Sequence, residues 1–346
     1  MAKGTGKVRV ARLTDIAAVA ELSRRAQGDE DGTRSLGLPV SAHPIGMFNL
    51  FRLPLGAFRP HDLLYVFERD GHIAGLLRVE REAPRDEWTV VELDAVGGQD
   101  AGETRFRLVQ HLLRDGSKRG AARFHVACAD ADDNVELFMQ HGFMRYGDER
   151  LLFREPGDLP EPWIEEAALA HGIRPAGPLD AVALSRLYAT VTPHPVQRLE
   201  AIRLADWERH GREGRVPRSS LAPILRFAEV EGFVVCAPGG GADGTQLDAF
   251  IQVGVAREDQ PHYLKVMARP GVDVGPATRF ALGVVAQRTE RARRELGVLA
   301  PVRTYESPID NELEAQGFEH IASVTLLMKE TLVRVAEPAL VPAGVR

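Results

Sequence analysis

The hydrophobic positions in the first half of the chain alternate in some stretches and recur with helical spacing in others. Residues 8–13 predict a short strand, and Thr14 stands where it would cap a helix over residues 15–27. Two β-rich runs flank Asp70-Gly71, a dipeptide typical of two-residue hairpins. The other elements expected in this half are strands at 63–69, 72–80 and 88–96, a helix at 103–118, a strand at 124–128, a helix at 134–141 and a strand at 151–153.

The second half repeats this order of elements. A strand is expected at Ile173, followed by a helix over residues 180–190 and a polar helical stretch around 196–210. The pattern then predicts strands at 232–237, 247–255 and 263–267, a long helix at 276–296, a strand at 302–305, a short helix near Asn311 and a last strand at 324–328. The expected fold class is mixed α/β (an α+β mixed sheet), and each half is a mixed, mostly antiparallel sheet flanked by helices.

Three short sequences of the first half recur in the same order in the second. The matches are Arg9 to Asp15 with Arg174 to Asp180, Thr104-Arg105-Phe106 with Thr278-Arg279-Phe280, and Gly142-Phe143 with Gly317-Phe318, at offsets of 165, 174 and 175 residues. Ordered matches at similar offsets indicate a duplicated fold. Proline interrupts helices and central strands, so the proline-rich stretch 155–162 marks a linker. The predicted domains are residues 1–157 and 158–346.

Composition limits the classes of function that fit. The 346 residues carry a net charge of −6 without a basic tract, so no nucleic-acid partner is expected. The only cysteines are Cys128 and Cys236, which argues against a disulfide framework and a thiolate zinc site and favours a reducing cytoplasm. No apolar stretch reaches the ~18 residues that a membrane helix needs, and the first residues lack a secretory pattern. The expectation is a cytoplasmic protein that binds neither membrane nor metal.

The segment from Asn134 to Phe143 carries the most specific family signal. It reads Asn-Val-Glu-Leu-Phe-Met-Gln-His-Gly-Phe and is followed by the strand residues 149–153. This succession of Asn, helix, Gly-Phe and final strand resembles the GNAT superfamily of acyl-CoA-dependent N-acyltransferases, and residues 311–318 are similar to it in shorter form. The resemblance implies a tandem GNAT protein with acetyl-CoA or another acyl-CoA as co-substrate. Its acceptor would be a small-molecule amine or a peptide amine.

In that family a loop of pattern Gln/Arg-x-x-Gly-x-Gly/Ala joins a strand to the next helix and holds the pyrophosphate of the acyl-CoA. Backbone N–H groups at a helix start have no intrahelical partner, and the helix dipole is positive there. The matching sequence here is Gln99-Asp-Ala-Gly102-Glu-Thr104. By this resemblance the residues that bind the co-substrate are Val96, Gly97, Gly98, Gln99, Ala101, Gly102, Thr104 and Asn134.

Departures from the loop pattern leave an ordinary strand-to-helix turn as the alternative. Asp100 and Glu103 place negative charge where an anion would bind, and Thr104 replaces a small residue. The corresponding loop of the second half, residues 272–277, lacks the polar first residue and contains Pro276, which has no N–H to donate. The site is therefore expected in the N-terminal copy.

Amine acylation needs a base, because an amine of the lysine type has a reference pKa of about 10.4. Glu92 and Asp94 lie on one face of the predicted third strand, and the resemblance implies that an acidic residue on that strand is catalytic and accepts the proton. The alternative is that these carboxylates pair with neighbours such as Arg78. The family often has a tyrosine five residues before the Phe of Gly-Phe to protonate the leaving thiolate, but this chain has Phe138 and Leu313 there.

Three further features complete the expectations. Tyr146 is expected to pack on the following strand, and Cys128 to be a buried, inert thiol. The apolar stretch 45–58 predicts either a wall of the acceptor pocket or a plug between the domains. The predicted function is acyl-CoA-dependent N-acetyl transfer in the N-terminal copy, and the alternative is a catalytically inactive tandem pseudo-acyltransferase that binds a ligand or a protein. A homodimer is compatible with the sequence.

Overall fold

The computed structural model describes residues 6–28, 35–38, 62–82, 86–96, 98, 100–129, 133–157, 159–160, 165–208, 218–237, 246–257, 260–292 and 296–331. The elements of the first half are β1 (Lys7–Val10), the 3-10 turn η1 (Leu13–Asp15), α1 (Ile16–Gly28), the 3-10 turn η2 (Ser35–Gly37), β2 (Asp62–Arg69), β3 (His72–Glu82), β4 (Glu87–Ala95), α3 (Ala101–Lys118), β5 (Arg123–Ala129), α4 (Asn134–Gln140) and β6 (Met144–Arg154).

The second half follows the same order of strands and helices. Its elements are α5 (Glu165–Ala170), β7 (Ile173–Pro175), η4 (Pro178–Asp180), α6 (Ala181–Val191), α7 (His194–Glu200), α8 (Leu204–Trp207), β8 (Phe227–Cys236), β9 (Leu247–Ala256), β10 (His262–Ala268), α10 (Gly275–Ala292), β11 (Val298–Arg303), η5 (Thr304–Glu306), α11 (Ser307–Ala315) and β12 (Glu319–Glu330).

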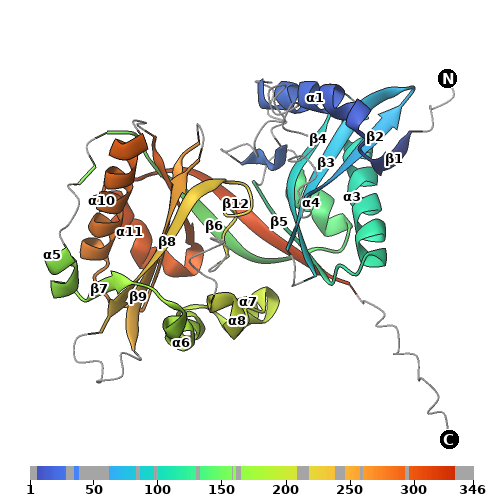
Figure 1. Ribbon diagram of the computed structural model, residues 1–346. Coiled ribbons are helices and arrows are strands. Elements are labelled where there is room, and N and C mark those ends of the chain that lie inside the picture. The colour runs from blue at the N-terminus through green and yellow to red at the C-terminus, as the bar shows by residue number, and fades with distance from the viewer. Residues whose placement is uncertain are drawn as a thin grey trace, which may run out of the picture.

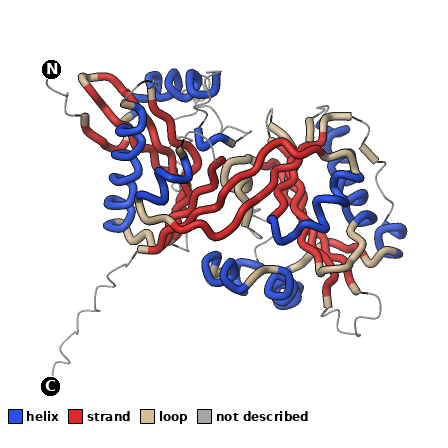
Figure 2. Tube along the Cα trace, turned by 180° about the vertical axis from the view of Figure 1, so that it is seen from behind, coloured by secondary structure: helices blue, strands red, loops and turns tan. Residues whose placement is uncertain are grey.

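The described strands join into one mixed sheet of twelve, in the order β1-β2-β3-β4-β5-β12-β6-β11-β10-β9-β8-β7. Among the described pairs, β4–β5 and β10–β11 are parallel and the others are antiparallel. The mixed, mostly antiparallel sheet predicted from the sequence is confirmed. The long strands β6 and β12 cross between the two lobes, so the sheet is continuous from one lobe to the other (Figure 1, Figure 2).

The last strand of each half is exchanged between the halves. β12 lies between β5 and β6, and β6 lies between β12 and β11. Val324 of β12 pairs with Ala129 on one side and with Glu149 of β6 on the other, and Glu149 pairs in turn with Arg303 of β11. A pseudo-twofold axis therefore passes between Val324 and Glu149. Each exchanged strand covers backbone hydrogen-bonding groups that would otherwise form open edges.

The repeated Arg and Asp residues form the same clamp in both halves. Arg9 binds both carboxylate oxygens of Asp15, at 2.5 and 2.9 Å, and Arg174 binds those of Asp180 at 2.9 and 2.6 Å. Both carboxylates also accept a main-chain N–H from the residue three positions upstream. Bidentate pairs of this kind fix geometry as well as charge. Each clamp fastens the first strand of its half to the helix that follows.

Local turn chemistry follows the sequence closely. Asp70 and Gly71 have φ of 51° and 80°, as a two-residue hairpin between β2 and β3 requires. Gly142 and Gly317, with φ of 78° and 82°, end α4 and α11. The N–H of the phenylalanine that follows each glycine donates to the carbonyl five residues before it, so both helices end in the same capping motif.

Some predicted boundaries are wrong. The final strands expected at 151–153 and 324–328 are the much longer β6 and β12, because each is paired along both edges. The described part of the polar stretch, residues 196–208, contains two short helices, α7 and α8, which are interrupted at Ala201 where φ is 44°. Trp207 of α8 is fully buried and packs in the core beneath α6.

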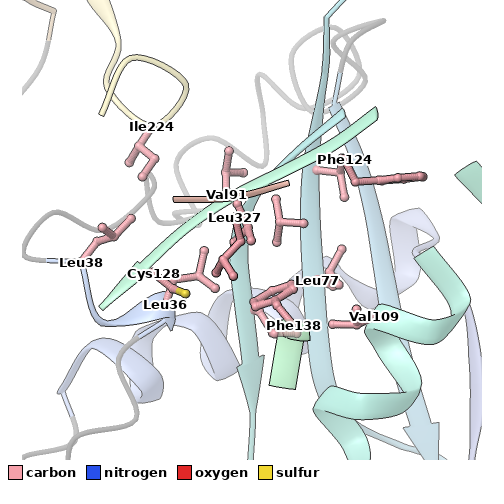
Figure 3. Close-up of a cluster of buried hydrophobic side chains, with 14 of the residues drawn as sticks. Leu36, Leu38, Leu77, Val91, Val109, Phe124, Cys128, Phe138, Ile224 and Leu327 are labelled. Atoms are coloured by element: carbon pink, nitrogen blue, oxygen red, sulfur yellow. The ribbon is translucent and has the colours of Figure 1, made fainter. Parts of the chain in front are cut away.

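Helices cover both faces of the sheet. In the first half, α3 packs on one face through Val109 and its neighbours, with Phe124 of β5 and Phe138 of α4 in the same core (Figure 3), and α1 packs on the opposite face through Val19. In the second half, α10 and α11 cover one face and α6 the other. Residues 221–225 of the second half belong to the core of the first, which ties the lobes together. None of the described helices combines the length and apolar character needed to span a membrane.

The strand exchange predicts that the halves do not fold independently. Residues 1–157 expressed alone would expose the facing edges of β5 and β6, which β12 covers in the whole chain. We expect this fragment to aggregate or lose native structure, and co-expression with residues 158–346 to restore a one-to-one complex. Size-exclusion chromatography and circular dichroism of the fragments, separate and together, test this. A monomeric fragment 1–157 with cooperative thermal unfolding would contradict it.

Candidate functional site

The first feature of the candidate site is the gap that opens where β4 and β5 separate. The strands pair in parallel over four residues, and Val90 opposite Val126 is the last pair. Val91 then bulges out of register with β3. Beyond it, β4 and β5 no longer pair with each other. Strand edges at such a separation can present N–H and C=O groups to an extended ligand.

Apolar side chains from η2 pack against this gap (Figure 3). Leu36 is 1% exposed and belongs to the same cluster as Val91 and Cys128. Gly37 approaches β5 so closely that a Cβ there would lie 2.7 Å from the Cβ of Ala129. Cys128 is buried, as predicted. The stretch 45–58, predicted to be a wall or a plug, lies outside the described residues.

The second feature is the open backbone at the start of α3. The helix begins at Ala101, directly after the turn that leaves β4. Gly98 in that turn has a φ of 115°, which favours glycine, and a Cβ added at Gly98 or Gly102 would meet no atom within 4 Å. Ala101 donates its N–H to the carbonyl of Gly98 at 3.1 Å. N–H groups one step further into a first helical turn, such as that of Gly102, have no intrahelical acceptor and can bind an anion. Gly97 and Gln99 lie outside the described residues.

The two acidic residues of this turn have basic partners. Asp100 lies 2.6 Å from Arg69, and Glu103 lies 2.6 Å from Arg107. The negative charge that would oppose an anion is therefore compensated locally. Exposed ion pairs are worth at most about 1 kcal/mol, so both arginines can also turn toward a bound phosphate.

The other predicted binding residues divide into a surface group and a supporting group. Thr104 is 2% exposed and faces β3, where a Cβ on Gly75 would lie 2.5 Å from its methyl carbon. Asn134 is also buried, and its side-chain oxygen accepts a hydrogen bond from Arg105, which ties α4 to α3. The surface group lies together at the start of α3, where its members are exposed or half-buried; they are Val96, Gly98, Ala101 and Gly102.

The two candidate bases lie on the opposite face of the sheet from α3. Glu92 and Asp94 are each 2% exposed. Ser23 of α1 donates to Glu92 at 2.6 Å, and the Arg78 guanidinium lies 3.0 Å from its other oxygen. The pairing with Arg78, weighed as the alternative for these carboxylates, is therefore present at Glu92. Asp94 lies two residues nearer the loop on the same face of β4.

In the second half, side chains of the chain itself occupy the start of α10. Asp273 accepts the N–H of Gly275, the first residue of the helix, at 2.9 Å. A Cβ on Gly275 would lie 2.5 Å from a carboxylate oxygen of Glu312. Pro276 removes the next donor. Two carboxylates and a missing N–H make this helix start unfavourable for a phosphate.

A buried lysine also crosses the gap between β10 and β11. Those strands pair over only two residues before they separate. Lys265, 1% exposed, donates to the carbonyl of Pro301 at 3.2 Å and to the carboxylate of Glu306 at 2.6 Å. These bonds occupy the place that corresponds to the open gap of the first half.

The two halves meet in a buried cluster of charges that the sequence did not indicate. Arg303 is 2% exposed and lies 2.9 Å from Glu149 and 2.7 Å from Glu200. Burial alone would lower the pKa of Arg303, but the two carboxylates hold it well above its ordinary value. Burial raises the pKa of Glu200, which accepts a hydrogen bond from Tyr188 at 2.8 Å. No sequence signal could have found this cluster, because its members are neighbours only through the strand exchange.

Solved structures with the same fold cover nearly the whole chain. A tandem GNAT protein from the clavulanic acid biosynthesis pathway matches at a TM-score of 0.55, with 13% identity, over 94% of this chain and 98% of its own. A GCN5-related N-acetyltransferase from Sphaerobacter thermophilus matches at 0.54, with 18% identity, over 94% and 95%. The glucosamine N-acetyltransferase region of a fungal multi-domain GH3 beta-N-acetylglucosaminidase matches at 0.57, with 13% identity, over 95% of this chain and 38% of that one.

These likenesses define the class of architecture. The chain has the tandem GNAT fold, as its sequence predicts. Identities of this size establish the fold alone, because one fold supports many functions. No sequence profile of a protein family matches the chain, and no curated protein sequence matches it significantly.

The buried pair at Glu92 predicts a large effect on stability. Glu92→Gln removes the buried carboxylate that lies against the half-buried Arg78 guanidinium, so we expect the free energy of unfolding to fall by about 3 kcal/mol. Urea denaturation followed by circular dichroism measures this. The matched control is Glu21→Gln on the exposed face of α1, whose pairs with Arg24 and Arg25 lie at the surface and whose loss should leave the midpoint unchanged. Equal midpoints for the two variants would refute the prediction.

Proposed function

We propose that this protein is an acyl-CoA-dependent N-acetyltransferase whose site lies in the N-terminal copy. The observation that supports this is the contrast between the halves. In the first, Gly98 and Gly102 leave the start of α3 open beside the gap between β4 and β5. In the second, Asp273 and Glu312 crowd the start of α10, and Lys265 crosses the gap. One site per chain is the expected stoichiometry.

The residues at the start of α3 fit the co-substrate. Backbone N–H groups around Gly102 would hold the diphosphate, with Arg69 and Arg107 nearby as counter-charges. An amide-containing arm would pair along β4 where that strand separates from β5, after Val90. Acetyl-CoA supplies an acyl group activated as a thioester. A backbone N–H near the bulge at Val91 would polarise its carbonyl.

Proton transfer is assigned to the two acids on the opposite face of β4. Glu92 is held by Ser23 and Arg78, so its position is fixed. Asp94, closer to the loop, is the residue that we propose accepts the proton of the acceptor amine, directly or through water. Phe138 stands where a proton-donating tyrosine would be and is fully buried. A thiol has a reference pKa of about 8.5, so the thiolate is able to leave without a dedicated acid.

Calorimetry with acetyl-CoA and with desulfo-CoA tests the location of the site. The wild-type chain should bind one equivalent, and Gly102→Trp should weaken binding at least about tenfold, since an indole would cover the N–H groups. Gly157→Trp is the matched control, because a Cβ there also meets open space but lies far along the chain from α3. No binding at millimolar acetyl-CoA would exclude the proposal. Binding without turnover of any amine in a broad panel would favour the inactive binding module.

Removing the proposed base should separate chemistry from binding. We expect Asp94→Asn to lower kcat about 100-fold, the low end of the usual contribution of a general base. The dissociation constant of acetyl-CoA should stay within about twofold, because Asp94 lies on the opposite face of the sheet from α3. Steady-state kinetics and calorimetry on one preparation make the comparison. An unchanged kcat would assign proton transfer to another group.

A further inference from the structure

A small cavity lies between the two halves, on the face of the sheet that carries Glu92 and Asp94. Its volume is about 30 Å³, more than the roughly 10–15 Å³ that a single water molecule requires. It therefore admits a small polar group rather than a whole substrate. The polar residues that line it come from both halves and are Thr89, His125, Tyr146, Arg218, Ser219, Ser220 and Arg303.

Two donors of this lining are buried and make no hydrogen bond. They are Nη1 of Arg303 and the hydroxyl of Ser220, on residues that are 2% and 4% exposed. The rest of each residue is fixed. Arg303 is held by Glu149 and Glu200 through its other nitrogens, and the main-chain N–H of Ser220 donates to Glu149 at 2.8 Å. A buried donor without a partner is energetically costly, so the arrangement suits a ligand that accepts hydrogen bonds.

The charged side chains at the wall of the cavity are arginines. Among the described residues no carboxylate lines it, whereas the guanidinium groups of Arg218 and Arg303 do. The carboxylates that balance these two guanidinium groups do not line the cavity. Glu87 pairs with Arg218, and Glu149 and Glu200 pair with Arg303. The two oxygens of a planar anion can accept hydrogen bonds from a guanidinium N–H group and from a nearby hydroxyl.

The position of the cavity connects it to the proposed chemistry. Thr89 and Val90 of β4 and Val126 and Ala127 of β5 also line it, and these residues flank the point where the strands separate. Ile224, on the segment that closes the cavity from the second half, faces this part of the first core (Figure 3). A group bound here is adjacent to the gap proposed for the thioester.

We infer that this cavity binds the carboxylate of the acceptor, so that the substrate class is a small amine bearing a carboxylate. The inference rests on the proposed function for its link to acyl transfer. Arg303 and Ser220 of the second half hold the carboxylate, and the amine extends toward β4 of the first. The second half, whose own helix start and strand gap are filled, thus supplies the selectivity of the site in the first.

Ligand binding measured without acetyl-CoA tests the carboxylate site directly. The probes are glycine and β-alanine, and each is compared with its own amide. Inorganic phosphate serves as a second anion. Binding to the full chain is measured by calorimetry or NMR titration. We expect each carboxylate to bind at least about tenfold more tightly than its amide. Equal binding of acid and amide, or no binding of either acid at 50 mM (roughly the weakest affinity of interest), would mean that the cavity holds only water and would overturn the inference. A preference for phosphate would overturn it as well, because the cavity would then select a different anion.

Ser220→Ala identifies the residues involved without disturbing the charge cluster. It removes only the unpartnered hydroxyl and keeps the main-chain bond to Glu149. We expect about tenfold weaker binding of the acids and unchanged binding of the amides, since a hydrogen bond to a charged group is worth about 1.5–3 kcal/mol. The matched control is Ser323→Ala, on an exposed part of β12, which should change nothing. Unaltered acid binding in Ser220→Ala would count against the assignment.

The two proposals fail separately. Selective binding of the acids by a chain that does not bind acetyl-CoA would leave the carboxylate site standing and remove the transferase. Binding of acetyl-CoA weakened by Gly102→Trp, without any distinction between acids and amides, would keep the transferase and remove the carboxylate site.

Discussion

β12, the last strand of the chain, forms backbone hydrogen bonds with β5 and β6 of the first half, while β6 is inserted between β12 and β11. This exchange supplies the central strands of the sheet. Without it, strands at the centre of the sheet would have unpaired edges in each half. It also fixes the pseudo-twofold relation of the halves at the pairing of Val324 with Glu149. The charge cluster and the small cavity between the halves lie beside this pairing.

The exchange carries charged residues into the interior. Glu149 on β6 meets Arg303 on β11, and Glu200 completes the pairing from α7. Buried charges are costly, and their mutual attraction offsets that cost only when the geometry is well satisfied. Here Arg303 has two carboxylate partners, its Nη1 makes no hydrogen bond, and the residue also lines the small cavity. The cluster that joins the halves therefore borders the cavity between them.

The two copies have diverged in the places that matter for binding. Both keep the clamp at the first strand, the glycine that ends the short helix and the parallel pair that separates. They differ in the side chains that lie at the start of the long helix and at the gap between the separating strands. Open backbone around Gly102 in one copy contrasts with Asp273 and Lys265 in the other. In the second copy side chains fill the helix start and the strand gap, and Arg303 of this copy lies against Glu149 of the first.

The sequence by itself determined what depends on neighbours along the chain: the order of elements, the turn at Asp70-Gly71, the helix ends at Gly142 and Gly317, and the duplication. It also identified the loop around Gly102 and the acids Glu92 and Asp94 as candidates. Only the tertiary structure decided that Asp100 is paired with Arg69, that Arg78 holds Glu92, and that Arg303 meets Glu149. Local patterns report backbone conformation within a few residues, whereas those pairings join residues between 14 and 154 positions apart, which strand pairing and strand exchange bring together.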